Sequence, residues 1–179
     1  PAARRWPGLR AVLQEQALPA LAEALRGAKP DLALADAALA PVIPDPSKIL
    51  CIGLNYASHV GEVGRALPTE PSVFARLNST LVAPGGAMVR PRVSEAFDFE
   101  GELAVVIGKR CRHVPRAEAL SVIAGYACFN DGSIRDWQRK SGGQFTLGKN
   151  FDGTGGFGPD IVTSDELPPV PSKFLPSVN

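Results

Sequence analysis

The sequence predicts an α+β protein, and three patterns indicate this class. An amphipathic helical pattern runs from residue 9 to residue 25 and predicts a helical cover. Short apolar runs typical of buried strands follow at residues 49–54, 103–107 and 124–129. Glycine and proline residues between these runs mark turns.

The N-terminal part is predicted to form a small region of its own. Pro19 lies inside the helical pattern and is expected to split or kink the helix, because proline removes a backbone donor. Residues 28–46 are rich in alanine and punctuated by proline, which is typical of a linker or a loose pair of strands. We therefore divide the chain into a small N-terminal region, residues 1–46, and a second unit, residues 47–179.

Composition indicates a protein that acts on small molecules. Nineteen basic and eighteen acidic residues leave a formal charge of +1, so the chain has no field to attract nucleic acid or an anionic membrane. Three cysteines without a C-x-x-C pair favour reduced thiols and a cytoplasmic location. No run approaches the roughly 18 apolar residues of a membrane span, and the start lacks the apolar core of a signal peptide.

An acidic stretch at residues 97–108 is the strongest functional signal. Side chains alternate between the faces of a strand, so Asp98, Glu100 and Glu102 are expected on one face. The apolar run that follows, residues 103–107, predicts a strand buried on both faces. Carboxylates that crowd together repel each other, and a hard divalent cation relieves that repulsion.

The same pattern is also typical of a solvated acidic edge. Gly101, between the two glutamates, favours the metal interpretation because a glycine inside a strand often marks the close approach of a ligand. Asp131 follows the second apolar run and is well placed to be a third oxygen ligand. Both interpretations stay open on these residues alone.

A polar cluster at residues 55–62 contains a candidate base. On a helical turn, His59 and Glu62 stand at i and i+3, close enough for the carboxylate to orient the imidazole. The alternative is an exposed histidine beside an unrelated glutamate on a surface loop.

Further polar residues follow the second apolar run. Arg135 and Gln138 are expected on the same side of a helical turn at i and i+3. Lys149 begins a glycine-rich segment, where it could contact an anionic substrate or lie in solvent. Residues 153–158 formally match G-x-G-x-x-G, but a proline follows and no helix opens there, so we exclude a dinucleotide site.

Together these motifs resemble the fumarylacetoacetate hydrolase family over residues 48–163. The matching segments are residues 55–62, 99–108, 125–138 and 148–152. The resemblance implies a mixed β-roll or sandwich behind a small variable N-terminal region, assembled as a homodimer. It stops near residues 167–169, so we expect the roll to be incomplete at its C-terminus.

The resemblance also implies roles for individual residues. The positions that hold Mg²⁺ or Mn²⁺ in the family match Glu100, Glu102 and Asp131. The catalytic positions match His59, Glu62 and Lys149. The substrate-binding positions match Arg135, Gln138 and Arg76, where many members have a lysine in place of Arg76.

The implied activity is a divalent-metal-dependent hydrolase. It would cleave a carbon–carbon bond in an acylpyruvate or another 1,3-dicarbonyl or 2-oxo acid, as in the catabolism of aromatic compounds. An isomerase, decarboxylase or dehydratase that uses a metal-bound enolate of a 2-oxo acid is the alternative among enzymes. A truncated, non-catalytic remnant is the alternative from another class.

Overall fold

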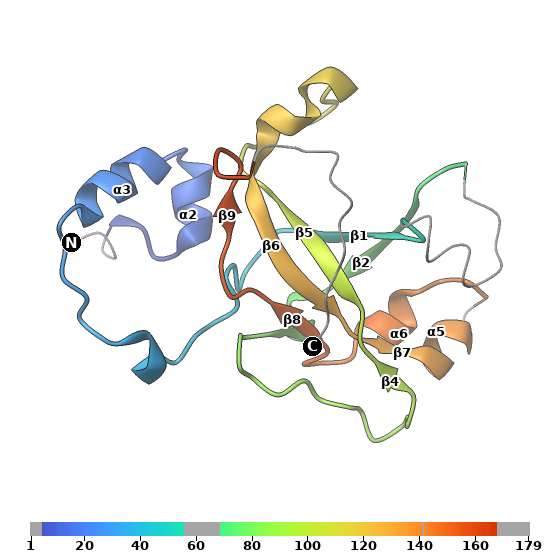
Figure 1. Cartoon of the computed structure of the whole chain (residues 1–179). Coiled ribbons are helices and arrows are strands. Elements are labelled where there is room, and N and C mark those ends of the chain that lie inside the picture. The colour runs from blue at the N-terminus through green and yellow to red at the C-terminus, as the bar shows by residue number, and fades with distance from the viewer. Residues whose placement is uncertain (1–4, 56–68, 141, 168–179) are drawn as a thin grey trace.

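The computed structural model describes residues 5–55, 69–140 and 142–167, with a helical N-terminal region beside a body of short sheets (Figure 1). The helices are α2 (Leu9–Gln14), α3 (Leu18–Leu25), α5 (Arg135–Lys140) and α6 (Thr146–Lys149), with short 3-10 helices at Leu34–Asp36, Asn78–Thr80 and Arg116–Val122. The strands are β1 (Ile49–Gly53), β2 (Ser72–Arg76), β3 (Leu81–Val82), β4 (Phe97–Asp98), β5 (Gly101–Ile107), β6 (Ile123–Asp131), β7 (Ser133–Ile134), β8 (Gly155–Phe157) and β9 (Val162–Thr163).

Two helices form where the sequence predicts one split helix, but the break precedes the proline. Gln16, between α2 and α3, has a φ of 54° in the left-handed region, and its side-chain amide donates to the carbonyls of Leu13 and Gly108. Pro19 lies in the first turn of α3, where a missing N–H costs no helical hydrogen bond. Residues 28–46 form no strand and behave as the predicted linker.

The main sheet contains strands β5 and β6, which bear Glu102 and Asp131. Its strands lie in the order β3-β8-β6-β5, and β9 pairs with another part of β6. Strands β5 and β6 are antiparallel, with Glu102 opposite Phe129. Strand β3 runs parallel to β8.

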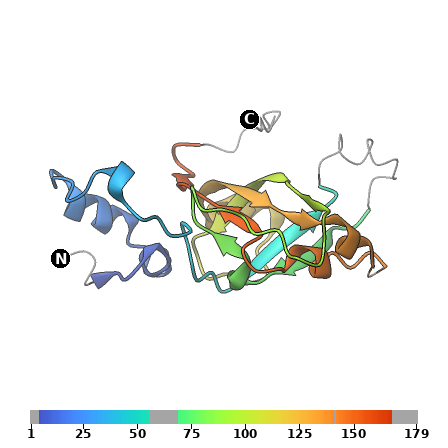
Figure 2. The same cartoon turned by 90° about the horizontal axis from the view of Figure 1, so that it is seen from below.

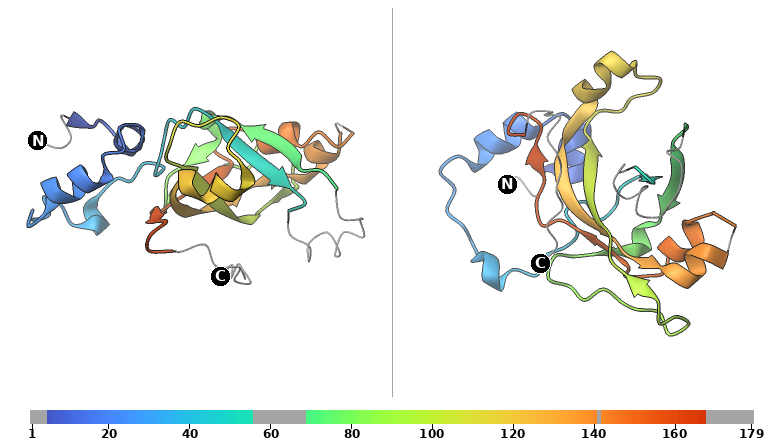
Figure 3. Two further views of the ribbon diagram at one scale, coloured as in Figure 1. Left: turned by 90° about the horizontal axis from the view of Figure 1, so that it is seen from above. Right: turned by 45° about the vertical axis from the view of Figure 1, so that its right-hand side comes forward.

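Strands β1 and β2 form a second layer. They pair antiparallel, with Cys51 opposite Phe74, and β1 confirms the strand predicted at residues 49–54. Figures 2 and 3 show this pair lying over one face of the main sheet, with the N-terminal helices to one side. A groove between the two layers follows from this arrangement, because residues of both layers line it.

The core lies at the end of the sheet nearest the N-terminal region. Leu13 and Ile43 from that region pack with Val106, Ala127 and Phe157 from the main sheet. The N-terminal helices thus close one end of the sheet, as the predicted helical cover requires.

Strand β5 is shorter and less buried than the sequence predicts. The predicted strand is interrupted at residues 99–100, and β4 pairs with β7 instead of continuing into β5. The prediction of a strand buried on both faces is wrong, because only the face of Val106 packs into the core. The apolar side chains of the opposite face are exposed, at 40% for Leu103, 47% for Val105 and 53% for Ile107.

Cys51, Cys111 and Cys128 are all free, which agrees with the expected reduced thiols. Within the described ranges, every helix is too short or too polar to cross a membrane.

Candidate functional site

The candidate site lies where strand β6 ends beside the start of strand β5. Asp131 is the last residue of β6 and is 4% exposed, as expected for a carboxylate that closes a buried strand. Its backbone N–H donates to the carbonyl of Glu100 at 2.8 Å. The side-chain oxygen of Asn130 accepts from the N–H of Glu100 at 3.2 Å. Strand pairing therefore brings the carboxylates of Glu100 and Asp131 to the same place.

Lys149 joins these two carboxylates. It is the last residue of α6 and is only 1% exposed, so the alternative of a solvated lysine is wrong. Its ammonium donates to Glu100 Oε2 at 2.6 Å and to Asp131 Oδ2 at 2.7 Å. It also donates to the carbonyl of Asp131 at 3.1 Å. Glu100, Asp131 and Lys149 thus form a largely buried cluster of charges. Loss of any one of these charges would unbalance the cluster, and an uncompensated buried charge is strongly destabilising.

Arg76 binds the other carboxylate oxygen of Asp131. It ends strand β2, and its side chain is fully buried. The guanidinium donates to Asp131 Oδ1 at 2.5 Å and to the carbonyl of Gly132 at 3.2 Å. It further donates to the hydroxyls of Thr154 at 2.9 Å and Thr80 at 3.3 Å. The sequence-based role of Arg76 in substrate binding stays a prediction.

Arg135 and Gln138 lie together at the mouth of the site, as their spacing predicts. Arg135 opens helix α5, and its Nη1 donates to the side-chain oxygen of Gln138 at 3.2 Å. The same guanidinium forms ion pairs with Asp98, at 2.8 Å, and with Glu100. Both residues line the groove, which is the position that substrate binding needs, although that role stays a prediction.

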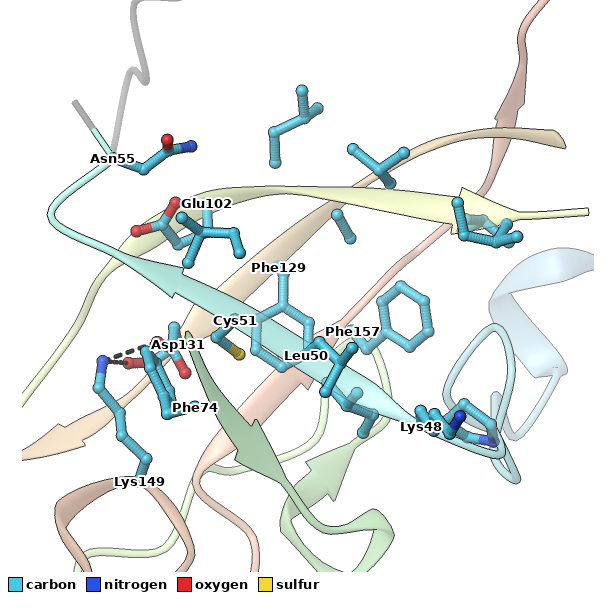
Figure 4. Close-up of a pocket in the computed structure, with 18 of the residues that line it drawn as sticks. Lys48, Leu50, Cys51, Asn55, Phe74, Glu102, Phe129, Asp131, Lys149 and Phe157 are labelled. Carbon is cyan, nitrogen blue, oxygen red and sulfur yellow. Dashed lines mark hydrogen bonds and ion pairs between the residues drawn. The ribbon is translucent and has the colours of Figure 1, made fainter. Parts of the chain in front are cut away.

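Glu102 lines the same groove as Glu100, Asp131 and Lys149. The groove has a volume of about 2610 Å³, larger than an ordinary small-molecule pocket, so it continues past the carboxylates between β1 and β5. Figure 4 shows Glu102 and Asp131 near strand β1, with Lys149 reaching Asp131.

The metal assignment of Glu100, Glu102 and Asp131 stays a prediction. Over residues 5–55, 69–140 and 142–167, no three histidine, cysteine, aspartate or glutamate side chains are grouped closely enough to hold a metal. The donor types do fit, since Glu100 and Asp131 each direct one oxygen at a single cation, the ammonium of Lys149. Carboxylate oxygens are the donors that Mg²⁺ and Mn²⁺ prefer.

Burial and neighbouring charges shift the pKa values of groups in the cluster. Burial acts to raise the pKa of Glu100, but Lys149 and Arg135 outweigh it and hold that pKa below its ordinary value. Burial also acts to lower the pKa of Arg135, yet Glu100 and Asp98 raise it overall. Burial, together with the charge of Asp131, raises the pKa of the Cys51 thiol to about 12. Glu100 is therefore a carboxylate and Cys51 a neutral thiol at neutral pH.

The predicted catalytic pair lies outside the described residues. His59 and Glu62 both fall in residues 56–68, so their placement and roles stay predictions. Strand β1 borders the groove through Cys51, and Asn55, the last described residue before that segment, also lines it.

Sequence reasoning missed two residues that support the cluster. Thr80 and Thr154 are fully buried, and each accepts a hydrogen bond from Arg76. Isolated threonines carry no sequence signal for such a role, because their partner lies elsewhere in the chain. The one available signal was Arg76 itself, since a buried guanidinium needs several acceptors.

Comparisons with known proteins agree on the family. The model for the C-terminal domain of fumarylacetoacetate (FAA) hydrolase matches residues 48–174. Among curated proteins, fumarylacetoacetate hydrolase domain-containing protein 2 homolog of Dictyostelium discoideum is 44% identical over 69% of this chain and 41% of its own length. Oxaloacetate tautomerase Fahd2a, mitochondrial, of Rattus norvegicus is 40% identical over 72% of this chain and 41% of its own length.

A solved structure with the same fold is the fumarylacetoacetate hydrolase of the psychrophile Exiguobacterium antarcticum. It superposes with a TM-score of 0.60 at 33% identity, over 81% of this chain and 55% of its own. The chain thus spans less than half the length of the two curated relatives and about half of that structure.

Proposed function

The chain belongs to the fumarylacetoacetate hydrolase family, and on that premise we propose that it is part of a divalent-metal-dependent hydrolase. The proposed reaction cleaves a carbon–carbon bond in an acylpyruvate or another 1,3-dicarbonyl or 2-oxo acid. The solved relative described as a fumarylacetoacetate hydrolase supports the hydrolytic class.

One observation supports this proposal more than any other. Glu100 and Asp131 each place a carboxylate oxygen within 2.7 Å of the same ammonium, that of Lys149. Two anionic oxygens that share one ammonium could bind a divalent cation in its place. Glu102 lines the same groove, so we propose these three carboxylates as the ligands of Mg²⁺ or Mn²⁺.

The chain's own residues supply the rest of the site. When bound, the metal would provide Lewis-acid assistance to the substrate oxygens. The ammonium of Lys149 donates to Glu100 and Asp131 here, and once a metal took its place it would be free to donate hydrogen bonds to negative charge that develops on the substrate. Arg135 and Gln138 line the groove and would orient the substrate carboxylate there.

A base is needed to activate water, and we propose His59 for this step. Glu62, three residues later, would hold the imidazole in the orientation that accepts a proton. Both residues follow Asn55, which lines the groove.

A second candidate activity is isomerisation of a 2-oxo acid. The curated relative from Rattus norvegicus is described as an oxaloacetate tautomerase. Tautomerisation moves a proton and needs no attacking water. The same dyad of His59 and Glu62 could carry that proton. Decarboxylation or dehydration of a 2-oxo acid would draw on the same residues.

Assembly and compartment are further proposals. We propose a homodimer, as the family resemblance implies, with a small 2-oxo acid or 1,3-dicarbonyl substrate as its ligand. The three free cysteines support a cytoplasmic location.

Turnover of an acylpyruvate by the full chain tests the hydrolase. Pyruvate release reports carbon–carbon cleavage, while exchange of the substrate's C3 protons with deuterium reports tautomerisation. Treatment with EDTA should abolish pyruvate release, and added Mn²⁺ should restore it. Undiminished release after EDTA would overturn the metal dependence, and deuterium exchange without pyruvate would favour the isomerase.

A matched pair of variants locates the effect in the site. Glu102→Gln should reduce metal-dependent turnover, because it removes one ligand charge at nearly constant size. Glu118→Gln makes the same change at an exposed glutamate in the 3-10 helix Arg116–Val122 and should leave turnover unchanged.

A further inference from the structure

The guanidinium of Arg76 is almost fully hydrogen-bonded to the protein, which leaves it little capacity to bind a substrate. Of the five N–H groups of a guanidinium, four donate here to Thr80, Asp131, Gly132 and Thr154. The side chain is fully buried, and Arg76 is absent from the described residues that line the groove. A substrate in the groove would have to pull this guanidinium out of four hydrogen bonds to reach it.

The contacts of Arg76 divide the two oxygens of one carboxylate between two cations. Asp131 Oδ1 accepts from Arg76 at 2.5 Å, whereas Oδ2 accepts from Lys149 at 2.7 Å. Because Arg76 binds Oδ1, the carboxylate cannot rotate, and Oδ2 points to the side where Lys149 and Glu100 lie. Arg76 also holds the chain at Gly132, directly after the aspartate.

The surroundings of Arg76 fix the guanidinium itself. Gly155 lies so close that an added Cβ there would stand 2.9 Å from Arg76 Nη2. The ring of Phe129 lies 5.7 Å from the guanidinium carbon and covers it. The hydroxyls of Thr80 and Thr154 accept from two different nitrogens, so the fork has one orientation.

We infer that Arg76 is a positioning residue that aims Asp131 Oδ2 at the proposed metal, in place of the substrate contact that the family resemblance implies. This inference rests on the proposed function. Arginine suits the task better than lysine, because its planar fork reaches Asp131 and Thr154 with separate nitrogens, whereas an ammonium offers one point. Residues that orient metal ligands typically change metal affinity by about 10- to 100-fold when they are replaced.

Two variants of the full chain test the inference. Arg76→Lys keeps the charge but loses the fork, and Thr154→Val keeps the size but removes the acceptor for Nη2. Arg26→Lys is the matched control, because Arg26 pairs with Glu23 on the surface and does not line the groove. Each protein is titrated with Mn²⁺ by calorimetry, and KM and kcat for an acylpyruvate are measured at saturating Mn²⁺.

We expect Arg76→Lys to raise the Kd for Mn²⁺ by about 10- to 100-fold and Thr154→Val by about 3- to 10-fold. KM at saturating Mn²⁺ should stay within about twofold of the unaltered chain, because the substrate does not touch Arg76. Arg26→Lys should change neither quantity. If Arg76→Lys does not fold, as shown by loss of its thermal transition, the Kd of Thr154→Val decides alone.

An unchanged Kd in both variants, with a raised KM at saturating Mn²⁺, would overturn the inference and restore the substrate contact. That result leaves the proposed metal site intact, since the unaltered chain still binds Mn²⁺. Failure of the unaltered chain to bind Mn²⁺ at all would instead overturn the proposed function and this inference together.

Discussion

Replacement of Lys149 by methionine should destabilise the chain and at the same time improve its metal binding. Lys149 is 1% exposed, and its ammonium lies 2.6 and 2.7 Å from the carboxylates of Glu100 and Asp131. Methionine fills a similar volume but leaves these carboxylates without their shared cation. Breaking a buried ion pair in this way costs about 3–5 kcal/mol of unfolding free energy. For a chain of this size, that corresponds to a Tm lower by about 6–20 °C.

The rescue by metal is the distinctive part of this prediction. A divalent cation would take the place of the ammonium, so Mn²⁺ should stabilise Lys149→Met more than the unaltered chain. At a free concentration 100 times its Kd, a bound ligand adds about 2.7 kcal/mol to the unfolding free energy. Thermal unfolding with and without Mn²⁺, followed by fluorescence, measures both effects. Lys29→Met, at an exposed lysine in the linker, is the control and should shift neither Tm.

Two results would contradict this prediction for Lys149. A Tm for metal-free Lys149→Met equal to that of the unaltered chain would show that the ion pairs contribute nothing. A clear loss of stability that Mn²⁺ cannot reverse would show that the carboxylates do not accept a divalent cation in place of the ammonium.

Three further predictions concern other parts of the molecule. At pH 8, iodoacetamide should alkylate Cys51 at least about 100-fold more slowly than the two exposed cysteines, because the raised pKa keeps Cys51 protonated; equal rates in peptide mass spectra would contradict this. Ile134→Ala should cost about 2–5 kcal/mol in urea unfolding because Ile134 is fully buried, whereas Ile107→Ala, at a half-exposed site, should cost about 0.5 kcal/mol; similar costs would show that burial does not separate them. Glu102→Gln should weaken Mn²⁺ binding, while His59→Ala should keep it and slow turnover by about 10²- to 10⁴-fold; a joint loss of binding would refute the division of roles.

Local patterns predicted the parts of the site that depend on neighbours in sequence. Arg135 and Gln138 meet because i and i+3 share a face of a helix, and their hydrogen bond confirms it. The end of a buried strand at Asp131 follows from an apolar run that stops at a turn. Such features need only a few residues of context.

Long-range pairing limited the rest of the prediction. Lys149 could equally have been solvated on sequence grounds, because its partners Glu100 and Asp131 lie 49 and 18 positions away. The break between the N-terminal helices depends on Gln16, whose amide contacts Gly108 in another region. A pattern within one segment cannot report a contact that the fold creates.

Burial was overestimated for a related reason. The apolar run of strand β5 suggested cover on both faces, yet Val105 and Ile107 are about half exposed. Only the face of Val106 meets the N-terminal region, through the cluster that includes Leu13. An apolar run shows that a strand can be buried on both sides, but the elements packed against it decide whether it is.

We propose that Glu100, Glu102 and Asp131 bind a divalent cation in place of the ammonium of Lys149. A crystal of the chain grown with Mn²⁺ and measured at the manganese absorption edge tests this binding. We expect an anomalous peak among these three carboxylates, with Lys149 Nζ moved away from both Glu100 and Asp131. Saturating Mn²⁺ with no peak there, and Lys149 still bonded to both carboxylates, would show that these carboxylates do not bind the divalent cation.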